Sequence, residues 1–187
     1  MSDLCTVPLK YSIVLFSPLP FVGIRSLSTR FTLSAFSEIY DPLLEDLVNF
    51  RYPTSNFEHS KEIHEADGFL LVYPVNSRDA FERIPACHKH ILGVRGVNTP
   101  YPIILVGNKT DLLSERLVST QEGQELASQL GCKFFETSAK LDINVTEAFH
   151  TLLGDIAKCK AAQVAALQVE STAATAHSWS QKSCIIL

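Results

Sequence analysis

Four short runs of apolar residues recur along the chain, separated by longer stretches of mixed polarity. Runs of this length that are rich in Val, Ile and Phe are typical of strands buried on both faces, which is the pattern of a parallel sheet. The sequence therefore predicts strands at Tyr11–Phe16 (YSIVLF), Phe69–Val75 (FLLVYPV), Pro102–Val106 (PIILV) and Lys133–Glu136 (KFFE).

Segments with the 3.6-residue period of a helix separate these runs. Helices are predicted at Asp79–Leu92, at Thr120–Leu130, at Val145–Lys160 and, on the solvated surface, at Asn56–Ala66. Gly131 stands at the position of a helix stop, whereas Pro85 inside another segment predicts a kink or a late start. Strands that alternate with helices indicate an α/β fold, a doubly wound and mostly parallel sheet with flanking helices.

Residues 161–187 differ in composition from the rest of the chain. They are rich first in Ala and then in Ser and Thr, and they carry no sustained apolar stripe. Their first part is compatible with a longer last helix, and beyond about Glu170 the composition predicts a flexible tail. We therefore expect one domain over residues 1–160, followed by a tail over residues 161–187.

Charge and cysteine content narrow the class of protein. The net charge of the 187 residues is −4 and no cluster of five or more Lys or Arg occurs, so no nucleic-acid partner is predicted. The five cysteines are odd in number and form no CxxC pair, which favours a reducing cytosol over a disulfide framework or a zinc site. No apolar stretch approaches the roughly eighteen residues of a membrane-spanning helix.

The run PIILVGNKTD places three polar residues directly after a predicted buried strand. Ligands of doubly wound sheets bind beyond the carboxyl ends of the strands, so Asn108, Lys109 and Asp111 are candidate binding residues. One carboxylate can accept hydrogen bonds from both N1–H and the exocyclic amine of guanine, and we assign this role to Asp111. The stem of Lys109 can lie along the base with its charged head in solvent. The Asn108 amide can tie neighbouring loops together.

A second polar motif, FFETSAK, follows the next predicted strand. Backbone N–H groups of Ser138, Ala139 and Lys140 can point outwards there and donate to O6 of guanine, while the Lys140 side chain covers the ring. An ordinary turn with solvated Asp and Lys side chains is the alternative interpretation. Two such motifs at the ends of successive strands favour a shared ligand instead.

Together, NKxD and ETSAK resemble the guanine-specificity loops of the Ras superfamily of small GTP-binding proteins, and most closely its Ras/Rap branch. The likeness is dense over residues 67–160 and patchy over residues 10–46. It implies binding of GTP and GDP with Mg²⁺, GTP hydrolysis, and a signalling switch that contacts effector and regulatory proteins. YDPLLED is similar to the effector segment YDPTIED of that branch, which implies an effector surface at Tyr40, Asp41, Pro42, Glu45 and Asp46.

The last four residues, Cys184-Ile185-Ile186-Leu187, form a C-a-a-X box. A terminal Leu favours a geranylgeranyl group on the cysteine. Such a group would attach the protein to the cytoplasmic face of the plasma membrane or of an endomembrane. Stable anchoring usually takes a second signal, and Lys182 is the one basic residue near the box.

The phosphate-binding part of the family pattern is altered. A phosphate loop reads G-x-x-x-x-G-K-[ST], in which glycines let backbone amides approach the phosphates, the Lys reaches them and the hydroxyl holds magnesium. After the first predicted strand this chain instead reads SPLPFVGIRSLSTRF. If Gly23 matches the last glycine, Ile24 takes the lysine position and Arg25 the hydroxyl position. If Arg25 and the serine after it instead match the Lys-Ser pair, Gly23 falls one residue too early for the last glycine. Neither register restores the loop.

The switch elements are altered as well. Leu43 stands where the family has the Thr that senses magnesium and the γ-phosphate, and the interval from Asp46 to Asp67 contains no D-x-x-G motif or catalytic Gln. This shortened interval would hold two strands in the family. We therefore expect the sheet to lack one internal strand and to leave backbone groups of Tyr11–Phe16 bare. The sequence assigns no catalytic residue, and magnesium is implied by the resemblance alone.

Three interpretations of function remain open from the sequence. The first is a membrane-anchored GTP-dependent switch, as the resemblance implies. The second is a catalytically inactive pseudo-GTPase, an interaction module that keeps the fold, the effector surface and the lipid anchor. The third is a truncated or mis-spliced product of a Ras-like gene, because the family pattern is incomplete over residues 17–66.

Overall fold

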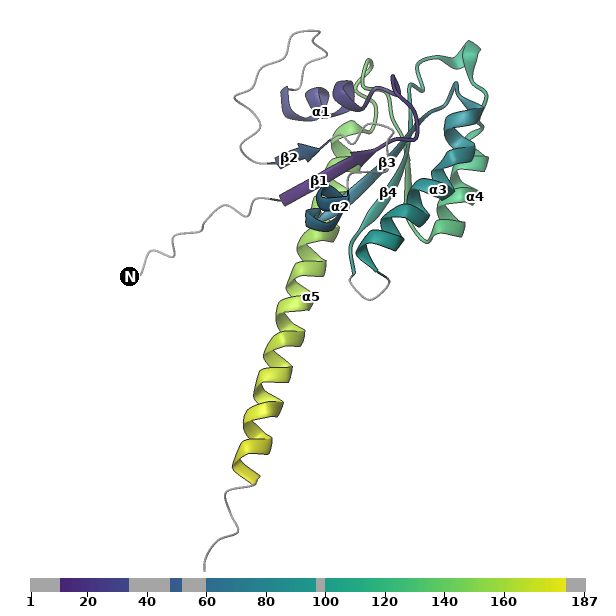
Figure 1. Ribbon diagram of the computed structural model, residues 1–187. Coiled ribbons are helices and arrows are strands. Elements are labelled where there is room, and N and C mark those ends of the chain that lie inside the picture. Colours follow the sequence, from purple (N-terminus) through teal and green to yellow (C-terminus); the bar gives the residue numbers. More distant parts are fainter. Residues whose placement is uncertain (1–10, 34–47, 52–59, 97–99, 181–187) are drawn as a thin grey trace, which may run out of the picture.

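A computed structural model describes residues 11–33, 48–51, 60–96 and 100–180, with the backbone alone for 33, 48–51 and 167–180. The described residues form one sheet of five parallel strands in the order β2-β1-β3-β4-β5 (Figure 1). The parallel α/β fold expected from the sequence is confirmed. The strands are β1 (Tyr11–Phe16), β2 (Val48–Arg51), β3 (Gly68–Pro74), β4 (Ile103–Asn108) and β5 (Lys133–Glu136).

Helices cover both faces of the sheet. They are α1 (Ile24–Leu33), α2 (Ser60–Glu65), α3 (Arg78–Arg95), α4 (Thr120–Leu130) and α5 (Val145–Ser180), with a 3₁₀ turn η2 (Leu113–Glu115). Successive strand residues point to opposite faces, so the strands contribute to two cores. Leu71 and Leu105 pack with α2, α3 and α4, whereas Leu70 and Val106 pack with α1 and α5. This explains why the strands read as continuous apolar runs.

The predicted bounds agree closely with the observed ones. Strands β1 and β5 and helix α4 have the predicted ends, and β3 and β4 are displaced by one or two residues. Helix α4 begins where Ser119 and Glu122 form a reciprocal capping box, and it ends at Gly131, whose φ is 68°. These local signals make the two ends of the helix predictable from the sequence, because they satisfy the backbone groups at each end.

Helix α3 starts earlier than Pro85 suggested. It begins at Arg78, because the Ser77 side chain accepts a hydrogen bond from the backbone N–H of Ala80 at 3.3 Å and so caps the helix. The expectation of a late start was wrong. Pro85 lies inside the helix on its exposed side, where water can satisfy the carbonyl that the missing amide hydrogen leaves unbonded.

Strand β1 is internal to the sheet. Ser12 is paired with Asn49 of β2, and Val14 is paired with Phe69 of β3. The expectation that Tyr11–Phe16 has bare backbone groups was therefore wrong. Of the two strands expected between Asp46 and Asp67, the described residues contain β2 alone. This strand is only four residues long, too short to give a periodic signal.

Helix α5 passes the predicted domain boundary without a break. It continues to Ser180, beyond the expected end at Lys160 and beyond the expected tail start at Glu170. Ala is the strongest helix former, and the Ala-rich stretch after residue 160 explains the extension. Lys160 joins the helix to the sheet through an ion pair with Asp67 at 2.8 Å. The last part of the helix extends away from the body (Figure 1).

Tyr73 of β3 provides a test of the core. Its side chain is fully buried, and its hydroxyl has no hydrogen-bond partner. The burial raises its pKa. An unpaired buried hydroxyl costs free energy, so Tyr73→Phe should raise the free energy of unfolding by about 1 kcal/mol in urea denaturation. Tyr11→Phe, at a partly exposed tyrosine, is the matched control and should leave stability unchanged. A loss of stability in Tyr73→Phe would contradict the prediction.

Candidate functional site

The loops that follow β4 and β5 lie side by side. The last pair of the ladder joins Gly107 to Glu136. Beyond it, the N–H of Thr137 donates to the carbonyl of Gly107 at 2.8 Å, and the N–H of Thr110 donates to the carbonyl of Thr137 at 3.2 Å. The structure thus brings together the residues that the sequence predicted. We call Asn108, Lys109, Asp111 and Ser138–Lys140 the strand-end site.

Asn108 connects this site to a third loop. Its side chain is buried, and its Nδ2 donates to the backbone carbonyl of Val22 at 2.9 Å. Its Oδ1 accepts a hydrogen bond from Oγ1 of Thr137 at 3.2 Å. As expected, the amide ties neighbouring loops together. The partner loop is residues 17–23, which we call the β1–α1 loop.

Lys109 holds the same loop from the outer side. Its backbone adopts a left-handed conformation with φ 66°, and its Nζ donates to the carbonyl of Phe21 at 2.8 Å. The sequence predicted a charged head in solvent, whereas the structure gives the ammonium a backbone partner. The side chain is half-buried, so its stem still lies where it can face a ligand.

Asp111 is oriented by the loop after β5. The hydroxyl of Ser138 donates to Oδ1 of Asp111 at 2.6 Å and accepts from the N–H of Leu141 at 3.1 Å. Ser138 is fully buried, so this geometry is shielded from water. One carboxylate oxygen is therefore fixed by the protein, and Asp111 stays partly exposed. A carboxylate held in this way is arranged to accept hydrogen bonds from a ligand.

Arg30 of α1 supports the site although the sequence did not indicate it. Its Nε donates to the carbonyl of Ala139 at 2.8 Å, and its Nη2 donates to the carbonyl of Lys140 at 3.1 Å. Asp142 lies 3.9 Å from the same guanidinium. Bonding these carbonyls fixes the orientation of the peptide units of the loop. The sequence carries no motif that joins residues so far apart.

The β1–α1 loop ends at a glycine that no other residue could replace without a shift. Gly23 has φ 89°, and a Cβ at this position would lie 2.6 Å from Nδ2 of Asn108. Helix α1 begins at the next residue, as a helix follows the last glycine of a phosphate loop. This supports the register in which Gly23 matches that glycine. Ile24 then stands at the lysine position and Arg25 at the hydroxyl position.

The described residues do not fit a magnesium site of the family type. Magnesium requires oxygen ligands, and the register gives Arg25, a cation, in place of the hydroxyl. The described part of the chain has no group of three or more His, Cys, Asp or Glu side chains placed to hold a metal ion. The predicted effector residues Tyr40, Asp41, Pro42, Glu45 and Asp46, the altered switch position Leu43 and the predicted prenylation site at Cys184 lie outside the described residues.

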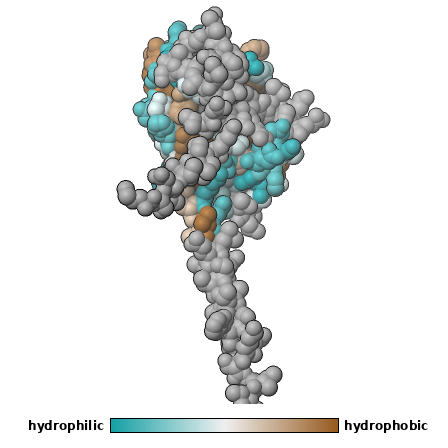
Figure 2. All heavy atoms as spheres, turned by 90° about the vertical axis from the view of Figure 1, so that its left-hand side faces the viewer, coloured by the Kyte–Doolittle hydropathy of each residue, from teal (hydrophilic) through white to brown (hydrophobic). Residues whose placement is uncertain are grey.

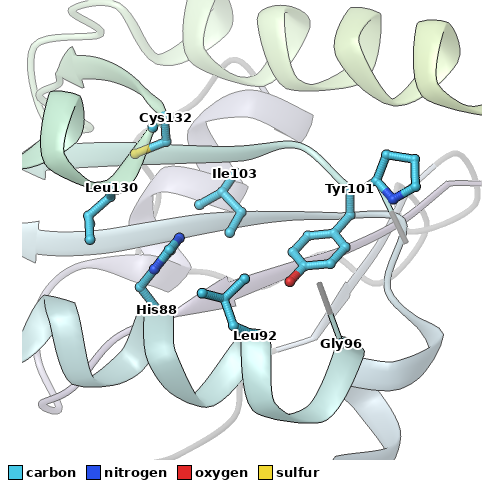
Figure 3. A pocket seen from close by; sticks show the side chains of 9 residues that line it. His88, Leu92, Gly96, Tyr101, Ile103, Leu130 and Cys132 are labelled. Atoms are coloured by element: carbon cyan, nitrogen blue, oxygen red, sulfur yellow. The ribbon is translucent and has the colours of Figure 1, made fainter. Parts of the chain in front are cut away.

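A separate cavity of about 390 Å³ opens at the amino ends of β4 and β5 (Figure 3). Burial lowers the pKa of His88 and raises the pKa of Cys132, so both side chains are neutral near pH 7. Ligands of α/β sheets bind at the opposite, carboxyl ends, and the cavity contains none of the strand-end site. It is lined by His88, Leu92, Gly96, Pro100, Tyr101, Ile103, Leu130, Gly131 and Cys132.

Comparison with known proteins relates the chain to one family. A model of the Ras family matches residues 55–158. The Ras-like protein rasS of Dictyostelium discoideum is 36% identical over 168 residues, which cover 81% of this chain and 86% of that protein. A Ras-like protein of Laccaria bicolor is 40% identical over 151 residues, 72% of each chain. The matched range of the family model includes the strand-end site and leaves out the β1–α1 loop.

Gly23 tests the contact between the β1–α1 loop and the site. Gly23→Ala places a Cβ against Nδ2 of Asn108 and forces a strained φ on an alanine. We expect the free energy of unfolding to fall by about 1–3 kcal/mol in urea denaturation. Gly93→Ala is the matched control, because its Cβ would meet nothing within 4 Å. It should raise stability by about 0.5–1 kcal/mol. Equal effects of the two substitutions would contradict the contact.

Proposed function

Because the chain belongs to the Ras family, we propose that it is a guanine-nucleotide-binding protein that acts as a membrane-anchored interaction module and does not hydrolyse GTP. Membership of this family implies guanine-nucleotide binding. The observation that carries the proposal is the strand-end site, whose parts are held by the protein's own hydrogen bonds at the carboxyl ends of β4 and β5. No step of GTP hydrolysis is assigned to any residue.

Recognition of the base follows from the groups that the site presents. The Asp111 carboxylate can accept from N1–H and from the exocyclic amine of guanine, two adjacent donors that adenine lacks. The peptide units of Ser138–Lys140, oriented in part by Arg30, can donate to O6. The stem of Lys109 can cover one face of the ring. These interactions select guanine without help from the phosphates.

The proposal leaves hydrolysis out because the groups it would need are replaced. Phosphoryl transfer depends on a lysine and a metal ion to neutralise the phosphates. The register places Ile24 at the lysine position, and Leu43 stands at the position of the γ-phosphate-sensing Thr. A nucleotide-driven switch orders its loops around the γ-phosphate and its magnesium ion. An interaction module needs neither contact, and this favours it over the switch.

The proposed partners are effector proteins and a membrane. The segment YDPLLED carries three carboxylates, Asp41, Glu45 and Asp46, which we assign to effector binding by its similarity to the family segment. Among the described residues no helix is both long and apolar enough to cross a membrane. On the face shown in Figure 2, hydrophilic and hydrophobic residues are intermixed over the described surface. The C-a-a-X box supports attachment through a prenyl group on Cys184, at the cytoplasmic face of the plasma membrane or an endomembrane.

Asp111→Asn tests base recognition. An asparagine can donate where guanine also donates, so guanine binding should weaken by about 2–3 kcal/mol, roughly a hundredfold. Xanthine carries a carbonyl in place of the exocyclic amine, so the variant should bind xanthosine nucleotides better than the parent does. Binding is measured by isothermal titration calorimetry.

The control for Asp111→Asn is Asp79→Asn on the exposed side of α3, which changes the charge equally and should leave both affinities unchanged. The amide oxygen that Asp111→Asn introduces can still accept the hydrogen bond from Ser138, so the fold should be retained. Unchanged guanine affinity in the Asp111 variant would refute the assignment.

Cys184→Ser tests the anchor. Prenyl transfer needs the thiol, so the substitution should abolish incorporation of a geranylgeranyl group and move the protein from the membrane fraction to the supernatant. Labelling in cells followed by fractionation provides the measurement. Cys159→Ser on α5 is the matched control and should behave as the parent protein. Equal membrane association of both variants would contradict the proposal.

A further inference from the structure

The two ends of the proposed nucleotide site differ in the groups that they offer. At the base end, Asn108, Asp111 and Ser138 all have hydrogen-bond partners within the protein, so their geometry is set before a ligand arrives. Arg30 adds bonds to the carbonyls of Ala139 and Lys140. A site arranged in advance loses little conformational entropy on binding.

The first half of the β1–α1 loop offers no free amide to a phosphate. Pro18 and Pro20 lack amide hydrogens. The N–H of Leu19, between them, donates to the hydroxyl of Ser17 at 3.4 Å, and that hydroxyl donates back to the Leu19 carbonyl at 2.9 Å. Over residues 18–20, two positions therefore have no donor and the third has an internal acceptor. A phosphate cradle requires several outward-facing amides.

The next residue places an aromatic ring at the surface of this loop. Phe21 has φ 62°, and its side chain is 90% exposed. Its carbonyl accepts the hydrogen bond from Nζ of Lys109, so the ammonium nearest to the loop already has a backbone partner. An exposed phenyl ring next to a carbonyl provides no favourable partner for an anion.

The charges at the start of α1 are also few. In the register that the structure supports, the lysine position is Ile24, a residue without charge. Arg25 is the one basic residue between Ser17 and Leu27, and its side chain is exposed. Together with the partial positive charge of the helix start, it can attract a phosphate only through a solvated interaction. The hydroxyl that holds magnesium in the family pattern is replaced by Arg25 in this register.

We infer that this protein recognises its ligand through the guanine base, and that the phosphate chain and Mg²⁺ contribute little to affinity. The ligand class is then guanine nucleosides and nucleotides of any phosphate number. The inference rests on the proposed function, because it requires the base to bind. It goes further by naming which part of the nucleotide carries the affinity.

The test compares guanosine, GMP, GDP and GTP on the purified full-length chain, each with magnesium and with EDTA. Ligand-observed NMR and calorimetry give the dissociation constants. We expect the four values to lie within about tenfold of one another, and to be unaffected by EDTA. Adenosine and ATP are the controls for base selectivity and should bind much more weakly than their guanine counterparts.

Two variants separate the ends of the site. Asp111→Asn should weaken the binding of guanosine and of GTP by the same factor, because the Asp111 carboxylate contacts the base alone. Arg25→Gln should leave the affinity for guanosine unchanged and should lower the affinity for GTP by less than about tenfold. Added salt should remove this difference. Thermal unfolding of both variants should match that of the parent, which separates loss of binding from loss of fold.

Three results would overturn the inference. GTP binding more than about tenfold tighter than guanosine binding would show that the phosphates carry affinity. A loss of GTP affinity in EDTA would show a magnesium contribution. In both cases the proposed base site would stand. Absence of guanine-selective binding for all four ligands would instead refute the proposed function, and the inference with it.

Discussion

The buried amide of Asn108 holds three loops at fixed positions, and the rest of the site depends on this geometry. Its two polar atoms have partners on different elements, the carbonyl of Val22 before α1 and the hydroxyl of Thr137 after β5. A buried polar group that loses its partner costs free energy, so neither loop can move away without leaving one unpaired. The same side chain therefore stabilises the fold and positions the candidate ligand site.

A second connection starts from α1. Because Gly23 leaves room for the Asn108 amide, α1 begins directly beside the strand-end site. From there Arg30 reaches the carbonyls of Ala139 and Lys140. The loop after β5 is thus held from one side by Asn108 through Thr137 and from the other by α1. Each contact restricts the conformations available to the others, so the network is more rigid than its separate bonds would be.

The sequence predicts the parts of this molecule that depend on local chemistry. Apolar runs mark β1, β3, β4 and β5 because these strands are buried on both faces, and a capping box marks α4 because it satisfies backbone groups within a few residues. The polar residues of the strand-end site follow from the rule that parallel strands end at one edge. Asn108 was predicted to tie neighbouring loops together, and its hydrogen bonds to Val22 and Thr137 agree, because its strand ends at the edge where these loops meet.

Features that depend on long-range contact are not visible in the sequence. Strand β2 is identified only by its pairing with β1, and the role of Arg30 depends on a contact across more than a hundred residues. The length of helix α5 was underestimated for a different reason. Apolar periodicity marks the part of a helix that packs on a core, and it carries no information about a helix that leaves the core. Intrinsic propensity is then the only signal, and Ala supplies it.

The contacts of the β1–α1 loop explain how its phosphate-binding residues can be absent while the base end stays ordered. Lys109 and Asn108 bond the backbone carbonyls of Phe21 and Val22, and carbonyls are present whatever the side chains are. Phosphate binding uses the opposite groups of such a loop, its amide hydrogens, together with a lysine and a hydroxyl side chain. Substitution by proline removes amides and keeps carbonyls. The base site is therefore held in place by Gly23 and by the backbone carbonyls of this loop. The side chains and amides that would bind phosphate are not needed for these contacts.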